Sequence, residues 1–162
     1  MSGRSTRNTP LRSMHLLKAI LLVATFGFLG AGSIFAVPHT PQPGSEERKP
    51  ICDRLREYVA MKVALKPLPQ PIVFKIDHLR VEDGYAWFEG FPQFKNGADS
   101  TQYLPDQGYI FLLHQSANGW EIKQDLSRSD VPDEKEAAQL RQALVGVPSS
   151  IMPDFWGKLL KR

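Results

Sequence analysis

The sequence has a single cysteine, Cys52, among its 162 residues. One cysteine cannot form a disulfide within the chain, so a folded domain of this size must be held by its hydrophobic core alone. A buried Cys52 would act as a small apolar side chain, and this is what we expect. An exposed one would be available for an intermolecular disulfide or for thiol chemistry.

The sequence also lacks the short motifs that mark most catalytic and cofactor sites. It contains no H-x-H, HExxH or C-x-x-C spacing for a metal, no G-x-S-x-G turn, no G-x-G-x-x-G and no Walker A loop. We therefore expect no metal site, no cofactor and no catalytic residue that a motif could identify.

Acidic residues are absent from the first 36 positions, where a basic stretch precedes an uncharged apolar run. Arg4, Arg7, Arg12 and Lys18 supply the charge, and residues 19–37 read AILLVATFGFLGAGSIFAV. This order is typical of an export signal. The sequence therefore predicts a periplasmic or secreted protein.

Two forms of this leader stay open. Residues 1–36 are a signal peptide if cleavage follows the small residues 31–33 or, with a weaker fit, Ala36. They are an anchor if the run is retained, because 19 residues rising about 1.5 Å each nearly match a hydrocarbon core of about 30 Å. In that form residues 19–37 would tether the protein to the inner membrane.

The basic character of the chain comes from the leader. The formal charge is +3, but without the four basic residues of the leader 16 of the 20 Lys and Arg remain against 17 Asp and Glu, a net charge of −1. Nucleic-acid binding draws on clustered basic charge. We therefore expect no nucleic-acid partner.

Proline and glycine then separate the leader from the rest of the chain. Residues 37–49 read VPHTPQPGSEERK, which predicts an extended linker with His39 at its surface. The remaining residues, 50–162, are expected to form one domain. Its first element is a helix over residues 51–65, where apolar side chains recur every three or four positions. The KPLPQP run ends this helix.

Alternating apolar residues predict four strands, over residues 72–81, 85–91, 109–115 and 120–126. Asp83-Gly84 and Asn118-Gly119 are typical hairpin turns. Residues 127–144 then predict a helix capped by Ser129 or Asp130. The fold class is therefore α+β, with the N-terminal helix packed on a curved antiparallel sheet of about four strands and a C-terminal helix behind. Cystatin-like and NTF2-like domains share this arrangement.

Aromatic residues on the second strand provide the best candidates for a binding site. One set should fill the core, and the other would face the concave side of the sheet and hold a ligand. The candidate ligand-binding residues are Trp87, Tyr85, His78 and His114.

Two functions are consistent with these candidates. We expect a non-enzymatic binding or accessory protein whose partner is an envelope protein or a small apolar ligand. The alternative is an envelope enzyme, hydrolytic in type, with its site in the concave face near His78, His114 and Trp87, where an imidazole could serve acid–base chemistry.

Several segments together resemble one protein family. These are Cys52-Asp53-Arg54-Leu55-Arg56 on a helix, residues 74–81 on a strand, Gly84-Tyr85-Ala86-Trp87, Pro92, Asn96-Gly97, Leu112-Leu113, Gly119-Trp120 and Ser129-Asp130-Val131. The chain resembles a family of small exported bacterial proteins without an assigned activity. That family has a helix with Leu-Arg, F-x-V-x-x-L-x-V and G-x-W-A strands, an LL and G-x-W hairpin and a T-D-V segment. The resemblance covers residues 50–131 and implies an exported domain, but it assigns no site residue.

The fate of the leader is directly measurable. If the signal peptide is removed, mass spectrometry of the protein isolated from the cell envelope will find a mature N-terminus at Ile34 or Val37, because signal peptidase cleaves after small residues. An intact N-terminus ahead of Ala19 in the membrane fraction would establish the anchored form instead.

Overall fold

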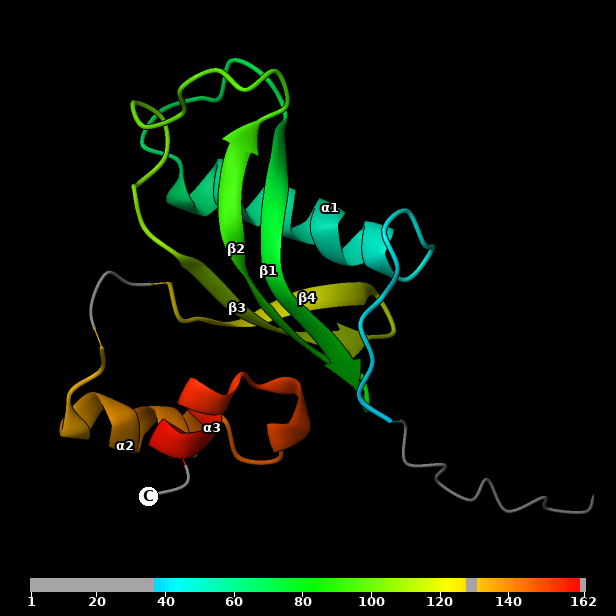
Figure 1. Ribbon diagram of the computed structural model, residues 1–162, viewed down its shortest axis with the longest axis vertical. Helices are drawn as coiled ribbons and strands as arrows, with labels where there is room; N and C mark the ends of the chain where they lie inside the picture. Colours follow the sequence, from blue (N-terminus) through cyan, green and yellow to red (C-terminus); the bar gives the residue numbers. More distant parts are fainter. Residues whose placement is uncertain (1–36, 128–130, 161–162) are drawn as a thin grey trace, which may run out of the picture. The chain divides into compact units, whose positions relative to one another are not determined.

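The computed structural model describes residues 37–127 and 131–160 (Figure 1). The predicted leader, residues 1–36, lies outside these ranges. None of the helices within them is both long and apolar enough to span a membrane.

Four antiparallel strands form one open, curved sheet in the order β1-β2-β3-β4 (Figure 1). The strands are β1 (Ile72–Glu82), β2 (Tyr85–Phe94), β3 (Tyr109–Ser116) and β4 (Gly119–Asp125). Both predicted turns are confirmed, since Asp83 and Gly84 have φ angles of 47° and 76°, which Asp, Asn and Gly adopt most readily, and Gly119 has a φ of 106°, which favours glycine alone. The predicted α+β class with four antiparallel strands is also confirmed.

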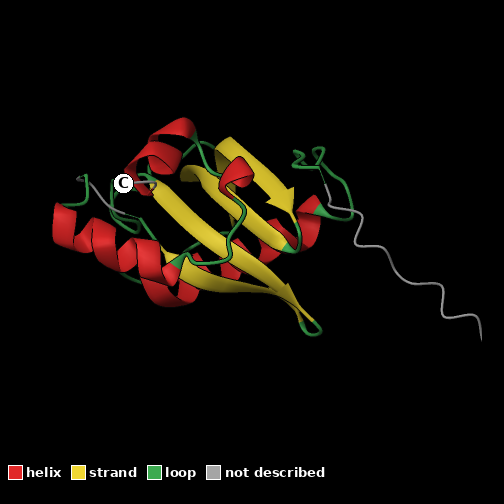
Figure 2. Cartoon of the chain, turned by 90° about the horizontal axis from the view of Figure 1, so that it is seen from below, coloured by secondary structure: helices red, strands yellow, loops and turns green. Residues whose placement is uncertain are grey.

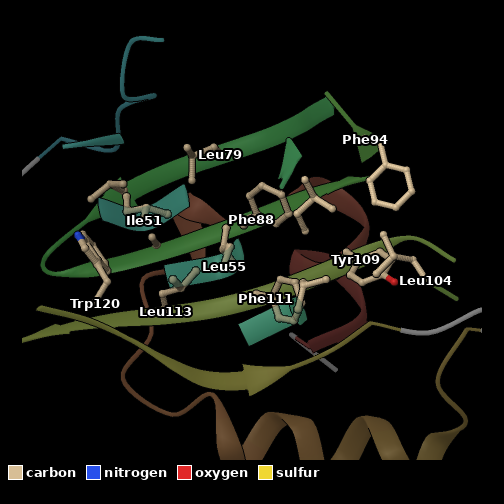
Figure 3. Packing of buried hydrophobic residues seen from close by; sticks show 14 residues of the cluster. Ile51, Leu55, Leu79, Phe88, Phe94, Leu104, Tyr109, Phe111, Leu113 and Trp120 are labelled. Carbon is tan, nitrogen blue, oxygen red and sulfur yellow. The ribbon is translucent and has the colours of Figure 1, made fainter. Parts of the chain in front are cut away.

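One face of the sheet is covered by α1 (Arg48–Tyr58), which continues into a π-helical turn, η1 (Val59–Val63). The predicted N-terminal helix is thus present, with its last turn widened. The side chains shared by this helix and the sheet are apolar and fully buried, and include Ile51, Leu55, Val59, Phe88 and Phe111 (Figure 3).

The opposite face is covered by the C-terminal segment. This segment consists of α2 (Glu134–Ala143), the 3₁₀ turn η2 (Ser149–Ile151) and α3 (Asp154–Leu160). It buries a second apolar cluster against the sheet, made of Trp87, Leu112, Leu126, Leu140, Leu144, Ile151 and Trp156. The strands therefore carry helices on both sides (Figure 2).

The helix α2 starts later than predicted. Its N-cap is Asp133, whose carboxylate accepts a hydrogen bond from the Glu136 N–H at 2.8 Å, while the Glu136 carboxylate accepts from the Asp133 N–H at 3.1 Å. The prediction of Ser129 or Asp130, which lie outside the described residues, as the cap is therefore wrong. A reciprocal capping box satisfies two backbone N–H groups at once, which favours Asp133 as the start.

The segment predicted as a linker contacts the edge of the sheet. His39 and Val81 exchange two backbone hydrogen bonds of 3.1 and 2.9 Å at the outer edge of β1. The His39 ring also binds the Glu47 carboxylate, with Nε2 and Oε2 2.9 Å apart, and this hydrogen bond raises the pKa of His39. Pro41 between them is buried. The segment is thus tied to the edge of β1 at His39, and His39 in turn is tied to Glu47.

A substitution at Gly90 on β2 tests how closely the backbones of β1 and β2 approach each other. A Cβ at this position would lie 2.5 Å from the Lys75 carbonyl oxygen of the neighbouring strand. We expect Gly90→Ala to lower the free energy of unfolding by about 1–3 kcal/mol, measured by urea denaturation.

Gly157→Ala is the matched control for this variant. Apart from the neighbouring residues and the backbone of its own helix, no atom lies within 4 Å of a Cβ at Gly157, which is on α3. Alanine favours a helix over glycine, so this variant should be as stable as the parent or slightly more so. Equal losses in the two variants would contradict the close approach at Gly90.

Candidate functional site

The four residues predicted to bind a ligand lie on one face of the sheet, the face that the C-terminal segment covers. Tyr85 and Trp87 are two positions apart on β2 and therefore point the same way. His114 of β3 lies opposite Tyr85, and His78 of β1 lies opposite Glu89, which follows Trp87 by two positions.

Trp87 has no exposed surface, with 0% of its area accessible. Its ring lies against that of Trp156 on α3, with centroids 5.6 Å apart, and its Nε1–H donates to Glu89 Oε1 at 3.1 Å. A ligand would reach this ring only if the C-terminal segment moved away from the sheet. In the conformation described here Trp87 is a core residue.

Tyr85 and His114 are brought together at the hairpin end of the sheet. Their ring centroids are 4.6 Å apart, and both side chains are half-buried. Glu121 lies opposite His114 on β4 and accepts a hydrogen bond of 2.8 Å from the Ser116 hydroxyl. This row presents a phenol, an imidazole and a carboxylate side by side, which is suited to holding a polar group by hydrogen bonds.

His78 is bound to the C-terminal segment. Its Nε2 lies 2.7 Å from the backbone carbonyl oxygen of Ile151, and can donate to it in the tautomer that carries hydrogen there. Arg80, two positions along β1, donates to the Ser150 carbonyl oxygen at 3.2 Å, and Glu82 accepts from the Ser150 hydroxyl. Three alternate side chains of β1 therefore fix η2 against the sheet.

The structure does not bring the two histidines together. His78 and His114 are two strands and four residues apart, which corresponds to roughly 16 Å for strands spaced about 4.8 Å with a rise of about 3.3 Å per residue. One ligand atom cannot bridge that distance. Within residues 37–127 and 131–160, no three His, Cys, Asp or Glu side chains are grouped so that they could hold a metal ion.

Cys52 lies on the buried side of α1. Only 7% of its surface is exposed, and burial raises the pKa of its thiol, an effect that outweighs the nearby Arg56 and Arg48 guanidinium groups. A raised pKa keeps the thiol protonated at neutral pH and therefore poorly nucleophilic. The expected burial of Cys52 is confirmed.

A hollow that no sequence pattern predicted lies where α1 ends and the chain turns into β1. It measures about 510 Å³ and is lined by Arg56, Glu57, Ala60 and residues 68–72. We call it the α1-end cleft. A cleft of several hundred Å³ with a largely apolar lining is typical of ligand sites.

Hydrogen bonds hold the walls of this cleft. The Arg56 Nε–H donates to the Ile72 carbonyl oxygen at 3.1 Å, so it joins the helix to the start of β1. Gln70 donates to the Asn96 side chain at 3.0 Å, and the Leu65 N–H donates to the Tyr103 carbonyl oxygen at 2.9 Å. The loop that forms one wall is therefore fixed on both sides.

One feature of the sequence pointed to this place without identifying it. The KPLPQP run predicted the end of a helix, and its prolines also build a rigid wall. The structure adds a second feature, because the helix beside this wall ends in the π-helical turn, with a 2.8 Å bond from the Ala64 N–H to the Val59 carbonyl oxygen. Such turns are rare and often occur at functional sites.

Comparisons with known proteins found no similar protein. No protein-family model matches the sequence, and neither the curated proteins nor the solved structures contain a match.

The role of His78 can be tested by stability. His78→Ala leaves the buried Ile151 carbonyl without its partner, so we expect a loss of about 1–3 kcal/mol in unfolding free energy. Amide hydrogen exchange should also become faster at Ser149–Ile151.

His114→Ala is the comparison for this measurement. Its ring contacts that of Tyr85 at the hairpin end of the sheet rather than the backbone of the C-terminal segment, so exchange at residues 149–151 should stay as in the parent. If both variants exchange alike, His78 does not fix η2.

Proposed function

We propose that the chain is an exported, non-enzymatic binding domain that docks a partner protein of the cell envelope through the α1-end cleft. The observation that supports this most is the cleft itself, about 510 Å³ between α1 and the proline-rich wall. Because both walls are held by hydrogen bonds, little ordering is needed on binding, which favours affinity.

Exposed apolar side chains on the same segment favour a protein over a small molecule as the occupant. Met61 and Leu65 are 60% and 66% exposed, and Met61 directly follows Ala60 of the cleft lining. Large exposed apolar side chains that gather beside a pocket are typical of protein interfaces. A partner would insert an apolar side chain into the cleft and cover Met61 and Leu65 with the surface around it.

The proline-rich wall favours a partner that donates hydrogen bonds. Pro69 and Pro71 have carbonyl oxygens but no backbone N–H groups. At these positions the wall accepts hydrogen bonds and cannot donate them. The partner segment is therefore expected to bring donors, such as free backbone N–H groups, to this rim.

The location outside the cytoplasm belongs to the same proposal. It rests on the order of basic and apolar residues in positions 1–37 and on the resemblance to small exported bacterial proteins. The partner would then be a protein of the periplasm or of the membrane surface, and residues 19–37 would add membrane association if they are retained.

Photo-crosslinking in intact cells tests this function. With p-benzoylphenylalanine in place of Met61 or Leu65, we expect both positions to capture the same protein. Ala60→Glu places a carboxylate in the apolar cleft and should reduce capture by about tenfold or more, the effect of losing one interface anchor.

The same crosslinker at Ala138 is the matched control, because this residue is exposed on α2. Capture of the same protein from Ala138, or capture from Met61 that Ala60→Glu leaves unchanged, would show that the cleft is not the docking surface. Circular dichroism of the Ala60→Glu variant checks that the fold is kept.

A further inference from the structure

A second site lies on the C-terminal segment, where α2 and α3 leave a hollow between them. It measures about 220 Å³ and is lined by Glu134 and Arg141 from α2 and by Phe155, Lys158 and Leu159 from α3. We call it the α2–α3 groove. It shares no residue with the α1-end cleft.

Beside Lys158, the α3 side of this groove has two apolar side chains. Phe155 and Leu159 are one helical turn apart, so they lie on the same side of α3. Phe155 remains 50% exposed although Trp156, the next residue, is buried against the sheet. A half-exposed phenylalanine beside a hollow offers a contact surface to an alkyl chain.

The α2 side provides a guanidinium group with unused donors. Arg141 Nη2 donates to Glu134 Oε1 at 3.0 Å, while the Arg141 Nε–H is buried without a hydrogen-bond partner. A guanidinium has five N–H groups in a planar fork that matches a carboxylate. A buried N–H without a hydrogen-bond partner is unfavourable. A ligand whose acceptor gives the Arg141 Nε–H a partner would therefore bind more tightly than a ligand without such an acceptor.

The charges of the groove suit a monoanion. Arg141 and Lys158 contribute two positive charges and Glu134 one negative charge, which leaves a net charge of +1. A single carboxylate balances that charge, whereas a phosphate dianion would exceed it. The Glu134 side chain is 82% exposed, so its hold on the guanidinium is weakened by solvent.

We propose that the α2–α3 groove binds a free fatty acid. The carboxylate pairs with Arg141 and Lys158, and the alkyl chain lies on Phe155 and Leu159. This site is independent of the docking function assigned to the α1-end cleft. It gives the C-terminal segment a ligand of its own in addition to its part in covering the sheet.

Calorimetric titration of the protein with decanoate, below the concentration at which decanoate forms micelles, tests the site. We expect saturable binding to one site, and about tenfold weaker binding to Arg141→Gln and to Phe155→Ala. Decanol has the same chain without the carboxylate, so it should bind about tenfold more weakly than decanoate and be insensitive to Arg141→Gln.

Arg54→Gln is the matched control. Arg54 on α1 also pairs with a glutamate, Glu57, and also has a buried Nε–H without a partner, but it lines neither the groove nor the α1-end cleft. Its variant should bind decanoate like the parent. So should Ala60→Glu, which separates this site from the α1-end cleft.

A variant that binds decanoate more tightly provides a second test, because a variant that fails to fold would bind decanoate more weakly. Glu134→Gln removes the competing carboxylate from an exposed position, and we expect about threefold tighter binding of decanoate. The proposal is overturned if decanoate shows no saturable binding, if Arg54→Gln weakens it as much as Arg141→Gln does, or if Glu134→Gln weakens it.

Discussion

The structure depends on a sheet that is apolar on both faces. Trp87 and Phe88 are neighbours on β2, yet the first packs with the C-terminal segment and the second with α1. Neither face can remain in water, because each carries several large side chains whose burial contributes roughly 1.5–3 kcal/mol apiece. Two helical layers are therefore required. The C-terminal segment is as necessary to the core as α1, and the face of the sheet that carries the expected ligand-binding residues is covered by the protein itself.

Hydrogen bonds fix the position of the C-terminal segment on the sheet. Apolar packing against Trp87 and Leu112 has little directional preference, whereas the hydrogen bonds of His78 and Arg80 to the backbone of η2 fix one position of the segment on β1. The residues that first suggested chemistry thus have a structural role. The surfaces left for binding are at the margins of the layers, at the end of α1 and between α2 and α3.

Local signals predicted the strands, the two hairpins and α1, because alternation, Asp-Gly and Asn-Gly turns and helical spacing act over a few residues. The burial of Trp87 was harder to predict, since the alternation of β2 indicates two faces but not what covers the second. Consecutive apolar residues 86–88 were the available sign, as strands covered on both faces lack clean alternation. The α1-end cleft forms because the loop after α1 brings Ile72 next to Arg56. No local sequence pattern specifies the path of that loop. The Asp133 to Glu136 spacing of the capping box was readable in the sequence.

The pairing of His39 with Val81 has a geometrical consequence. It places the entry of the chain near the hairpin end of β1, while Ile72, at the other end of the same strand, lines the α1-end cleft. Nine residues of strand separate the two points, a distance of about 30 Å. β1 therefore acts as a rigid spacer. The pairing of His39 with the sheet and the α1-end cleft therefore occupy opposite ends of the same strand, so a partner bound in the cleft leaves the His39 end of β1 uncovered.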